Sequence, residues 1–416
     1  MRTIIFSLLF IWASVAQAQL SNQRQWLADP VLQLAVHPAA LADSSLPGIS
    51  IHGNASLGLV GSAGLLDLYL QNDGFIDNDE KQVILGRMGD DNRFYYADNF
   101  GPIMIAGRLG KIPFSVGVDR YRNYGLTFND ARSLELLLRG NAVFAGERVE
   151  DNLGYHNLEA DRLSLGTAVR LGKAKLGVRA HYLMGRRMTA LDQFEYGLFT
   201  AEDGTQLTLD ANYALYESTG DGSGLGVDLS FEMPVGKKLK LHANIFDLGT
   251  MSWDVREVVN NTQVDFRGIN LNDLVDGGIP DIQLEDTLRR SLFPDSTNGT
   301  YSHALPARGQ IGVQYELKKG RIVFVQLLGG IGDFAPGGRQ PMAVVGYQRH
   351  GKVLSLGAQA FVGGTETYGF GGLGALHLHS KKGFHLDLVG EFQNIVGLAL
   401  QSNGGLRGHL GLALGF

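Results

Sequence analysis

The 416-residue sequence contains no cysteine. In a chain that is exported, as argued below, this excludes a disulfide scaffold and any thiolate site for catalysis or metal binding. The sequence also lacks a run of about 18 uncharged apolar residues, which argues against transmembrane helices. The formal net charge is only -6. This small charge favours neither nucleic acid as a partner nor a polybasic contact with a membrane surface.

The first 18 residues have the pattern of a cleavable export signal. Arg2 precedes an apolar run from Ile4 to Trp12, and Ala16-Gln17-Ala18 places small residues around a cleavage point before Gln19. The apolar run is too short to cross a bilayer. The sequence therefore predicts a signal peptide at 1–18 and export of the rest of the chain.

The sequence is rich in two-residue alternation. In the final stretch, GLRGHLGLALGF, every second residue from Leu406 to Phe416 is leucine, glycine or phenylalanine, while Arg407 and His409 fall between them. Successive side chains of a strand point to opposite faces, and a transmembrane barrel turns its apolar face to lipid and its polar face to the lumen. We therefore predict an all-β fold over 47–416, a transmembrane up-and-down antiparallel β-barrel of about 14 strands, within a range of 14 to 16.

The same alternation assigns polar side chains to the inner wall of the barrel. Asp228 and Glu232 lie on one expected strand and Lys240 and His242 on the next, so opposite charges can pair across the turn near Gly236. Such residues either form a selective filter or satisfy the ordinary polarity of a lumen. The candidate lumen-facing residues are Arg162, Arg170, Lys175, Arg179, His181, Asp228, Glu232, Lys240, His242, His377, His379, His385 and His409.

Tight turns of glycine and lysine punctuate these strands. An even number of strands fits between consecutive turns, so all of the turns can lie on one rim, and the long insertions 63–98, 126–158 and 251–303 then lie on the extracellular rim. Whether 188–217 forms a further pair of strands decides between fourteen and sixteen. In the third insertion, Ile282, Leu284, Leu288 and Leu292 recur at helical spacing. The turns are Gly110-Lys111, Gly172-Lys173, Gly236-Lys237, Lys318-Lys319-Gly320, Gly351-Lys352 and Lys381-Lys382-Gly383.

Before the first strand, LQLAVHPAALADSSLPGISI contains the pair Pro38-Ala39. This pair resembles the Asn-Pro-Ala motif of fatty-acid-transporter-like barrels and of a Bacteroidota outer-membrane family of unknown function, although His37 stands where Asn is usual. The segments RGNAVFAGERV, with Gly140 and Asn141, DRYRNYGLTF and NIFDLGTMSW also resemble the second family. The resemblance implies a barrel of about fourteen strands in an outer membrane, with an N-terminal segment at or inside the lumen, and it implies no activity.

The C-terminal Phe416 closes the last alternating strand. Such a terminal aromatic strand resembles the signal that the barrel insertion machinery of the outer membrane reads. We therefore expect this machinery and outer-membrane lipid as partners, and the outer membrane of a Gram-negative cell as the location.

The sequence gives no sign of a cofactor or an enzyme. Imidazole is a common metal ligand, and His379 and His385 flank the turn at 381–383, but no ligand spacing supports a site. The acidic stretch DGFIDNDEK matches no calcium-binding loop, and glycine runs such as GGLGALHLHS lack the phosphate-binding pattern. Nucleophile, base and acid fall into no recognisable motif. We predict no metal, no cofactor and no catalytic residues.

Two functions remain open at this point. The first is a channel or facilitator for small solutes, hydrophobic ones included, in which residues 19–46 act as a plug in the lumen. The alternative is a structural or interaction barrel, a secretion or surface-assembly accessory that binds a protein partner through its outer loops.

Overall fold

The computed structural model describes residues 37–44, 46, 48–62, 76–90, 92–204, 206–267, 294–331, 341–363, 366–379, 384–394 and 404–416. The expected signal peptide at 1–18, most of the segment 19–46, the expected helix around 282–292 and the turn at 381–383 lie outside these ranges.

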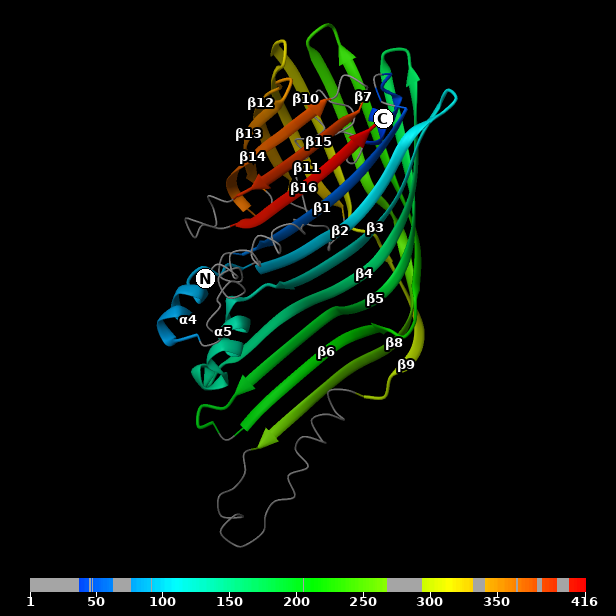
Figure 1. Cartoon of the computed structure of the whole chain (residues 1–416). Coiled ribbons are helices and arrows are strands. Elements are labelled where there is room, and N and C mark those ends of the chain that lie inside the picture. Colours follow the sequence, from blue (N-terminus) through cyan, green and yellow to red (C-terminus); the bar gives the residue numbers. More distant parts are fainter. Residues whose placement is uncertain are drawn as a thin grey trace, which may run out of the picture.

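Sixteen strands of the described residues form one antiparallel sheet, which confirms the all-β prediction (Figure 1). The strands are β1 (Ile49–Gly61), β2 (Asn92–Leu109), β3 (Ile112–Phe128), β4 (Arg148–Leu171), β5 (Ala174–Thr200), β6 (Gln206–Ser218), β7 (Gly222–Val235), β8 (Leu239–Arg267), β9 (Thr297–Ala304), β10 (Ala307–Lys318), β11 (Arg321–Ile331), β12 (Met342–Arg349), β13 (Leu354–Gly363), β14 (Glu366–His379), β15 (His385–Gln393) and β16 (Gly404–Gly415). The helical elements are η2 (Pro38–Ala42), α4 (Asn78–Leu85), α5 (Ala131–Arg139) and η3 (Asn141–Phe144).

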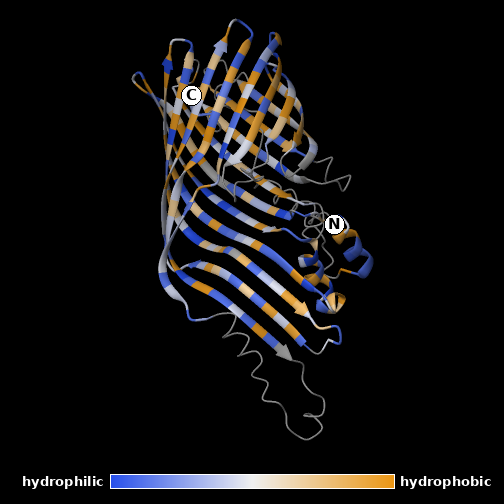
Figure 2. Ribbon diagram, turned by 180° about the vertical axis from the view of Figure 1, so that it is seen from behind, coloured by the Kyte–Doolittle hydropathy of each residue, from blue (hydrophilic) through white to orange (hydrophobic). Residues whose placement is uncertain are grey.

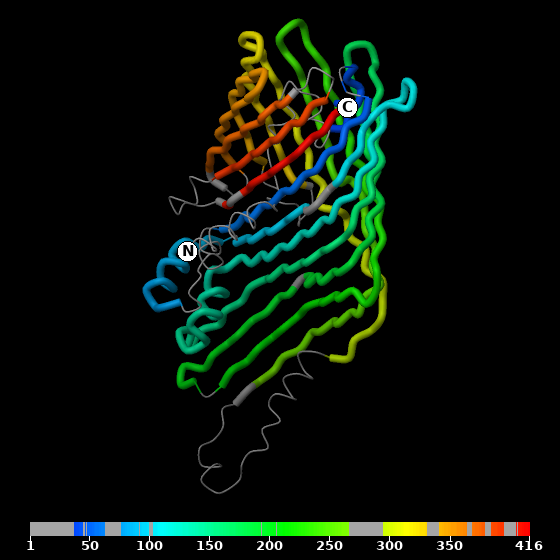
Figure 3. The backbone as a smooth tube through the Cα atoms, viewed as in Figure 1, coloured from blue at the N-terminus to red at the C-terminus, as the bar shows by residue number. Residues whose placement is uncertain are grey.

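The sheet closes on itself. β1 pairs with β2 on one side and with β16 on the other, so the first and last strands lie side by side in the wall (Figure 3). The first part of β5 pairs with β7, and the first part of β8 pairs with β7 and β10. This circuit omits β6 and β9 and contains the other fourteen strands. We call it the ring, and it confirms the expected strand number of about fourteen.

The short hairpins of the ring gather on one rim. Gly110, Gly172, Gly236 and Gly320 have φ values of 64°, 61°, 67° and 76°, a left-handed conformation that glycine adopts without steric penalty. These glycines lie in the predicted turns. The backbone N–H of Phe416 donates to the Ile49 carbonyl oxygen at 3.0 Å, and the phenyl group of Phe416 lies 5.7 Å from that of Phe384. The C-terminus therefore lies at this rim, as expected.

The two faces of the ring differ in polarity. Outward side chains of the strands are apolar and exposed, as Leu165 with 62% of its surface accessible and Leu327 with 52% illustrate. Inward side chains that alternate with them are buried and mostly polar, and Figure 2 shows this two-residue alternation along the strands. An apolar outer belt is the surface that a bilayer requires. No helix among the described residues has the length and apolarity needed to cross a membrane.

Part of the sheet extends beyond the ring, and the predicted long loops contain much of it. Of the further pair of strands considered at 188–217, residues 188–200 continue the single strand β5, whereas β6 is a strand of its own. The insertion 126–158 contains α5, η3 and the start of β4, and 251–303 contains the end of β8 and all but the last residue of β9. We call this extension the outer wall: Arg148–Leu158 of β4, Met188–Thr200 of β5, β6, Met251–Arg267 of β8, and β9.

The length of these strands explains the extension. β5 has 27 residues and β8 has 29, whereas about 9–11 residues cross a bilayer. Figure 1 shows β5, β6 and β8 continuing far past the ends of β10 to β16. Helix α4 also falls in an expected loop, and the acidic stretch at 73–81 provides its cap. Asp77 accepts a hydrogen bond from the Glu80 N–H at 2.8 Å, and the Glu80 carboxylate accepts from the Asp77 N–H at 2.9 Å.

Candidate functional site inside the ring

Three layers of buried side chains follow one another along the inner face of β4, β5 and β8. From the short-hairpin rim outward, β5 presents Lys175, then Arg179 and His181, and finally Leu183 and Met188. The first layer surrounds His37, the second surrounds Arg162, and the third is apolar.

The first layer holds the N-terminal segment against the wall. Nδ1 of His37 lies 2.7 Å from Asn244 Oδ1, and the N–H of Ala39 donates to Ser230 Oγ at 2.6 Å. A Cβ atom added to Gly177 would come within 2.2 Å of the Ala39 nitrogen, so the segment lies directly on the backbone of β5. Pro38 fits here because the first position of a helix needs no N–H donor.

Charges fasten the same segment to the wall at two further points. The ammonium of Lys175 lies 2.8 Å from Asp43 Oδ2 and 2.8 Å from Glu232 Oε1. The guanidinium of Arg108 donates to the Asp43 carbonyl oxygen at 2.5 Å, and that of Arg170 to the Ala42 oxygen at 3.4 Å. Buried carboxylates are stable only when cations or hydrogen-bond donors compensate them. Lys175 therefore links the segment to the strands.

The second layer is an ion network across β3, β4, β5, β7 and β8. Arg162 donates to both carboxylate oxygens of Asp119, at 3.0 and 2.7 Å, and to Asp247 Oδ1 at 2.8 Å. Asp228 accepts from the Asp247 N–H at 3.0 Å and lies 2.9 Å from His181 Nε2. These contacts join five strands by charge-assisted bonds.

A bulge in β8 makes this network possible. Asp247 has a φ of 54°, and the β7–β8 register shifts between Val227 and Leu229, so that Asp228 faces two residues. A bulge reverses which side chains point inward. Before it, His242 and Asn244 are buried, and after it, Met251 and Trp253 are buried.

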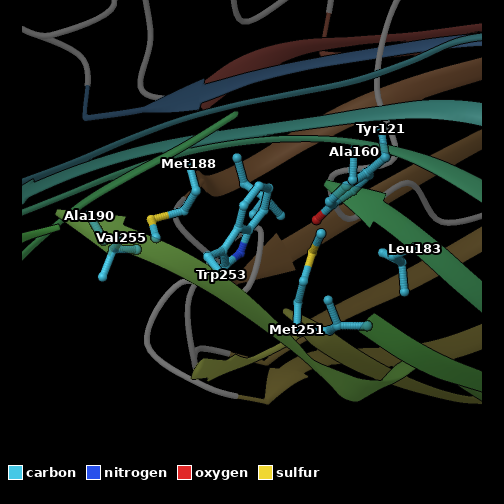
Figure 4. Close-up of a cluster of buried hydrophobic side chains, with 10 residues drawn as sticks. Tyr121, Ala160, Leu183, Met188, Ala190, Met251, Trp253 and Val255 are labelled. Atoms are coloured by element: carbon cyan, nitrogen blue, oxygen red, sulfur yellow. The ribbon is translucent and has the colours of Figure 1, made fainter. Parts of the chain in front are cut away.

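The third layer is apolar and lies where β4, β5 and β8 leave the ring. Trp253, 1% exposed, packs with Met188 and Val255, and its ring lies against the backbone of Gly185 and Gly222, where an added Cβ would approach it within 2.4 Å (Figure 4). The other members are Tyr121, Leu158, Ala160, Leu183, Ala190, Met251 and Leu305.

The expected pairing of Asp228 and Glu232 with Lys240 and His242 holds for one carboxylate. Lys240 Nζ lies 3.5 Å from Glu232 Oε1 and His242 Nδ1 lies 3.8 Å from Glu232 Oε2. Asp228 instead pairs with His181, because the β7–β8 register places Glu232, and not Asp228, opposite His242.

The histidines of the last strands do not gather in one place. His377 lies 2.7 Å from Asp387 and 2.9 Å from Ser355 Oγ, all three buried. The β14–β15 register places His379 opposite His385 across the turn, as expected. His409 is buried opposite Glu391 on β15.

The four residues on which the family resemblance rests lie in two different parts of the structure. Pro38 and Ala39 form η2 in the first layer. Gly140 ends α5 with a φ of 81°, and Asn141 begins η3 and donates to Thr200 Oγ1 at 3.4 Å. The second pair thus positions a helix beside the outer wall.

Sequence alternation places Ser230 and Asn244 on the inner face, but sequence reasoning missed four other members of the first two layers: Asp43, Asp119, Asp247, and Arg308, whose guanidinium lies 3.8 Å from Asp247. Alternation alone would also have assigned Asp119 to the inner face, since it keeps the parity of its strand. No local signal marks Asp43 or Asp247, because one lies outside the strands and the other in a bulge.

The model of a family described as a family of unknown function (DUF5723) matches residues 193–379, which confirms the resemblance to a family of unknown function. These residues include Asp228, Glu232, His242 and Asp247. A search of curated proteins finds no match.

Solved outer-membrane barrels align with nearly the whole chain at low identity. A FadL homologue of Pseudomonas aeruginosa is 11% identical, with a TM-score of 0.45, covering 97% of this chain and 95% of its own. The Ralstonia pickettii toluene transporter TbuX is 10% identical, with a TM-score of 0.44 and coverages of 97% and 98%. The P. putida toluene transporter TodX is 9% identical, with a TM-score of 0.40 and coverages of 92% and 92%.

Proposed function

We propose that this protein is an outer-membrane channel or facilitator for small hydrophobic solutes, with the N-terminal segment as a plug in its lumen. The observation that carries the proposal is the order of the three layers. An apolar layer around Trp253 lies toward the extracellular end, and a segment from outside the strands lies below it near the short-hairpin rim.

The apolar layer suits entry of a hydrophobic solute. Ligand sites are lined mainly by apolar and aromatic side chains with a few polar groups, and the layer combines Trp253, Met188 and Met251 with the hydroxyl of Tyr121. Methionine side chains adapt to ligands of different shape. A channel for ions alone would not need such a layer.

The plug suits gated passage. Residues 37–43 contact β5 through Lys175 and Gly177 and β7 through Ser230, all of them residues of the inner face. Since a few contacts hold the segment, its displacement would open a path without changing the ring.

Tryptophan fluorescence tests solute entry. The tryptophans of the sequence are Trp12, Trp26 and Trp253. A protein made without residues 1–18 and carrying Trp26→Phe therefore reports on Trp253 alone. Toluene should change its emission saturably in the folded barrel, and Met188→Lys should abolish the effect. A linear, unsaturable response identical in both proteins would contradict solute binding at this layer.

Conductance in a planar bilayer tests the plug. The full protein should conduct rarely and a variant lacking residues 19–46 should conduct in discrete steps. Silence of both proteins, with the barrel intact on a gel, would contradict a channel.

The outer wall favours a second candidate, an interaction barrel. Its outward side chains include exposed ion pairs, such as Arg148–Asp210 and Arg256–Glu217, and these present a polar surface beyond the bilayer. Photo-crosslinking from Asp254 in cells should then recover one protein reproducibly.

A further inference from the structure

We propose that His37, Glu232 and His242 bind a divalent transition-metal ion of the zinc type, which fastens the N-terminal segment to the ring. The site stands on its own geometry, and only its consequence for gating rests on the proposed channel function. The metal experiment and the conductance experiment can therefore fail separately.

The first donor of the proposed site is the imidazole of His37. Its Nδ1 lies 2.7 Å from Asn244 Oδ1, which is an acceptor, so Nδ1 carries the proton and Nε2 presents a lone pair. That lone pair lies 3.8 Å from Glu232 Oε2. Neither of these two buried atoms has a hydrogen-bond partner among the residues that the structure describes. Two buried acceptors that face each other without a donor are costly, and a cation between them would compensate both.

The third donor is the imidazole of His242. Its Nδ1 lies 3.8 Å from the same Glu232 Oε2, because the β7–β8 register places the two residues opposite each other. One ligand atom from each of the three residues lies within 4.8 Å of the other two. An ion with bonds of about 2.0–2.2 Å can contact all three, and two imidazoles with one carboxylate are a donor set that zinc accepts.

The neighbouring cations leave the site usable. Lys175 and Lys240 both approach Oε1 of Glu232, at 2.8 and 3.5 Å, so Oε2 keeps its lone pairs. Asp43, 2.8 Å from the ammonium of Lys175, compensates one of these positive charges. The other charge, on Lys240, is 31% exposed and therefore screened by water.

A second group of similar composition shows what a non-binding cluster looks like. His181, Asp228 and Asp247 also lie close enough for one ion. There, Asp247 accepts from Arg162, and Asp228 accepts from the Asp247 N–H and faces Arg179 at 3.9 Å. Guanidinium groups occupy the place of a metal in the second group, whereas the first group holds its two acceptors without such a donor.

The proposed ion would join parts of the chain that are distant in sequence. His37 and Asn244 are 207 positions apart, and His37 precedes the first strand. Asn244 acts as the residue that orients the imidazole. Metal ligation would thus set how firmly the segment stays in the lumen.

Zinc binding tests the site. Calorimetry of the purified, folded full-length protein with ZnCl₂ should show one saturable site per chain, and Co²⁺ should give visible absorption of a low-coordinate nitrogen–oxygen site. His37→Gln and Glu232→Gln should abolish both signals. Asn244→Ala, which removes the orienting bond, should weaken zinc binding by about 10–100-fold. His181→Gln is the matched control and should bind as the parent protein does.

A spin label tests the fastening. Because the chain has no cysteine, Ser44→Cys provides a unique attachment point beside the segment. Its mobility should rise when EDTA removes the metal and should already be high in His37→Gln. Absence of zinc binding by the folded parent protein, equal binding by folded His37→Gln, or a label that ignores EDTA would each overturn the proposal.

Discussion

The two halves of β4 have opposite patterns. From Leu163 to Leu171, within the ring, the odd-numbered residues are apolar or threonine and point outward, while polar Arg162 and Ser164 are buried. From Arg148 to Ala160, in and next to the outer wall, apolar Val149 and Leu158 are buried, while Arg148 and Glu150 are exposed. β8 changes in the same way between Asn244 and Trp253.

The solvent explains this reversal. Within the bilayer the outer face meets hydrocarbon, so apolar residues point outward and the polar groups must be satisfied inside. Beyond the bilayer both sides of the sheet can reach water, and burial inside favours apolar residues, as in a soluble sheet. The point at which the pattern reverses marks one edge of the membrane.

The largest expected effect comes from giving the inner face of the ring an apolar side chain of the kind that the outer wall buries. Arg162→Leu makes the side chain apolar, as in the third layer, but leaves Asp119 and Asp247 without their main cation. Removing one partner of a buried ion pair destabilises by about 3–5 kcal/mol. Urea unfolding of the barrel in detergent should show this loss. The matched control is Arg256→Leu, whose pair with Glu217 has side chains 54% and 41% exposed, so its loss should stay below about 1 kcal/mol.

The second prediction compares outward positions of equal exposure. Leu165 in the ring is 62% exposed and Val259 in the outer wall is 60% exposed. Leu165→Arg should destabilise the barrel in lipid bilayers by about 2–4 kcal/mol, since arginine near the bilayer midplane faces hydrocarbon. Val259→Arg should change stability by no more than about 0.5 kcal/mol. Similar losses at both positions in lipid would place the outer wall inside the membrane and end the comparison.

The third prediction concerns the contact between the segment and the ring. Gly177→Ala places a methyl group against the backbone of Ala39, and overpacking of this kind destabilises by about 1–3 kcal/mol. Displacement of the segment would relieve the clash, so a spin label at Ser44→Cys should become mobile while the ring stays folded. Gly309→Ala in β10, where an added Cβ meets nothing within 4 Å, should leave the label unchanged. An immobile label in Gly177→Ala would show that the wall adjusts instead.

Residues of the ring were predictable because their alternation is local. Parity alone placed Lys175, Arg179, His181 and Glu232 on the inner face, and glycine with positive φ marked the turns. The outer wall was not predictable in this way. There the alternation is present, but the apolar residues point inward and the polar residues outward. A search for strands with an apolar outward face therefore assigns segments such as 148–158 to loops.

The contacts that build the candidate site could not be predicted from the local alternation of residues. The left-handed φ of Asp247 shifts the register of β8, and no sequence rule marks an aspartate in that role. The contact of His37 with Asn244 joins residues 207 positions apart. Such contacts follow from closure of the ring, which brings η2 against β5 and β7 only after the strands have paired.

The smallest expected effect concerns Ser355, His377 and Asp387, which have the order of a catalytic triad. Ser355 Oγ lies 2.9 Å from His377 Nε2, and His377 Nδ1 lies 2.7 Å from Asp387. Catalysis also needs access of a substrate to the hydroxyl, but Ser355 is 1% exposed. We expect no labelling of the folded protein by a fluorophosphonate probe, and Ser355→Ala should cost about 0.5–1.5 kcal/mol, the range for one hydrogen bond. Stoichiometric labelling that His377→Gln removes would instead identify an activated serine, and the ring interior would then carry out chemistry as well as provide polarity.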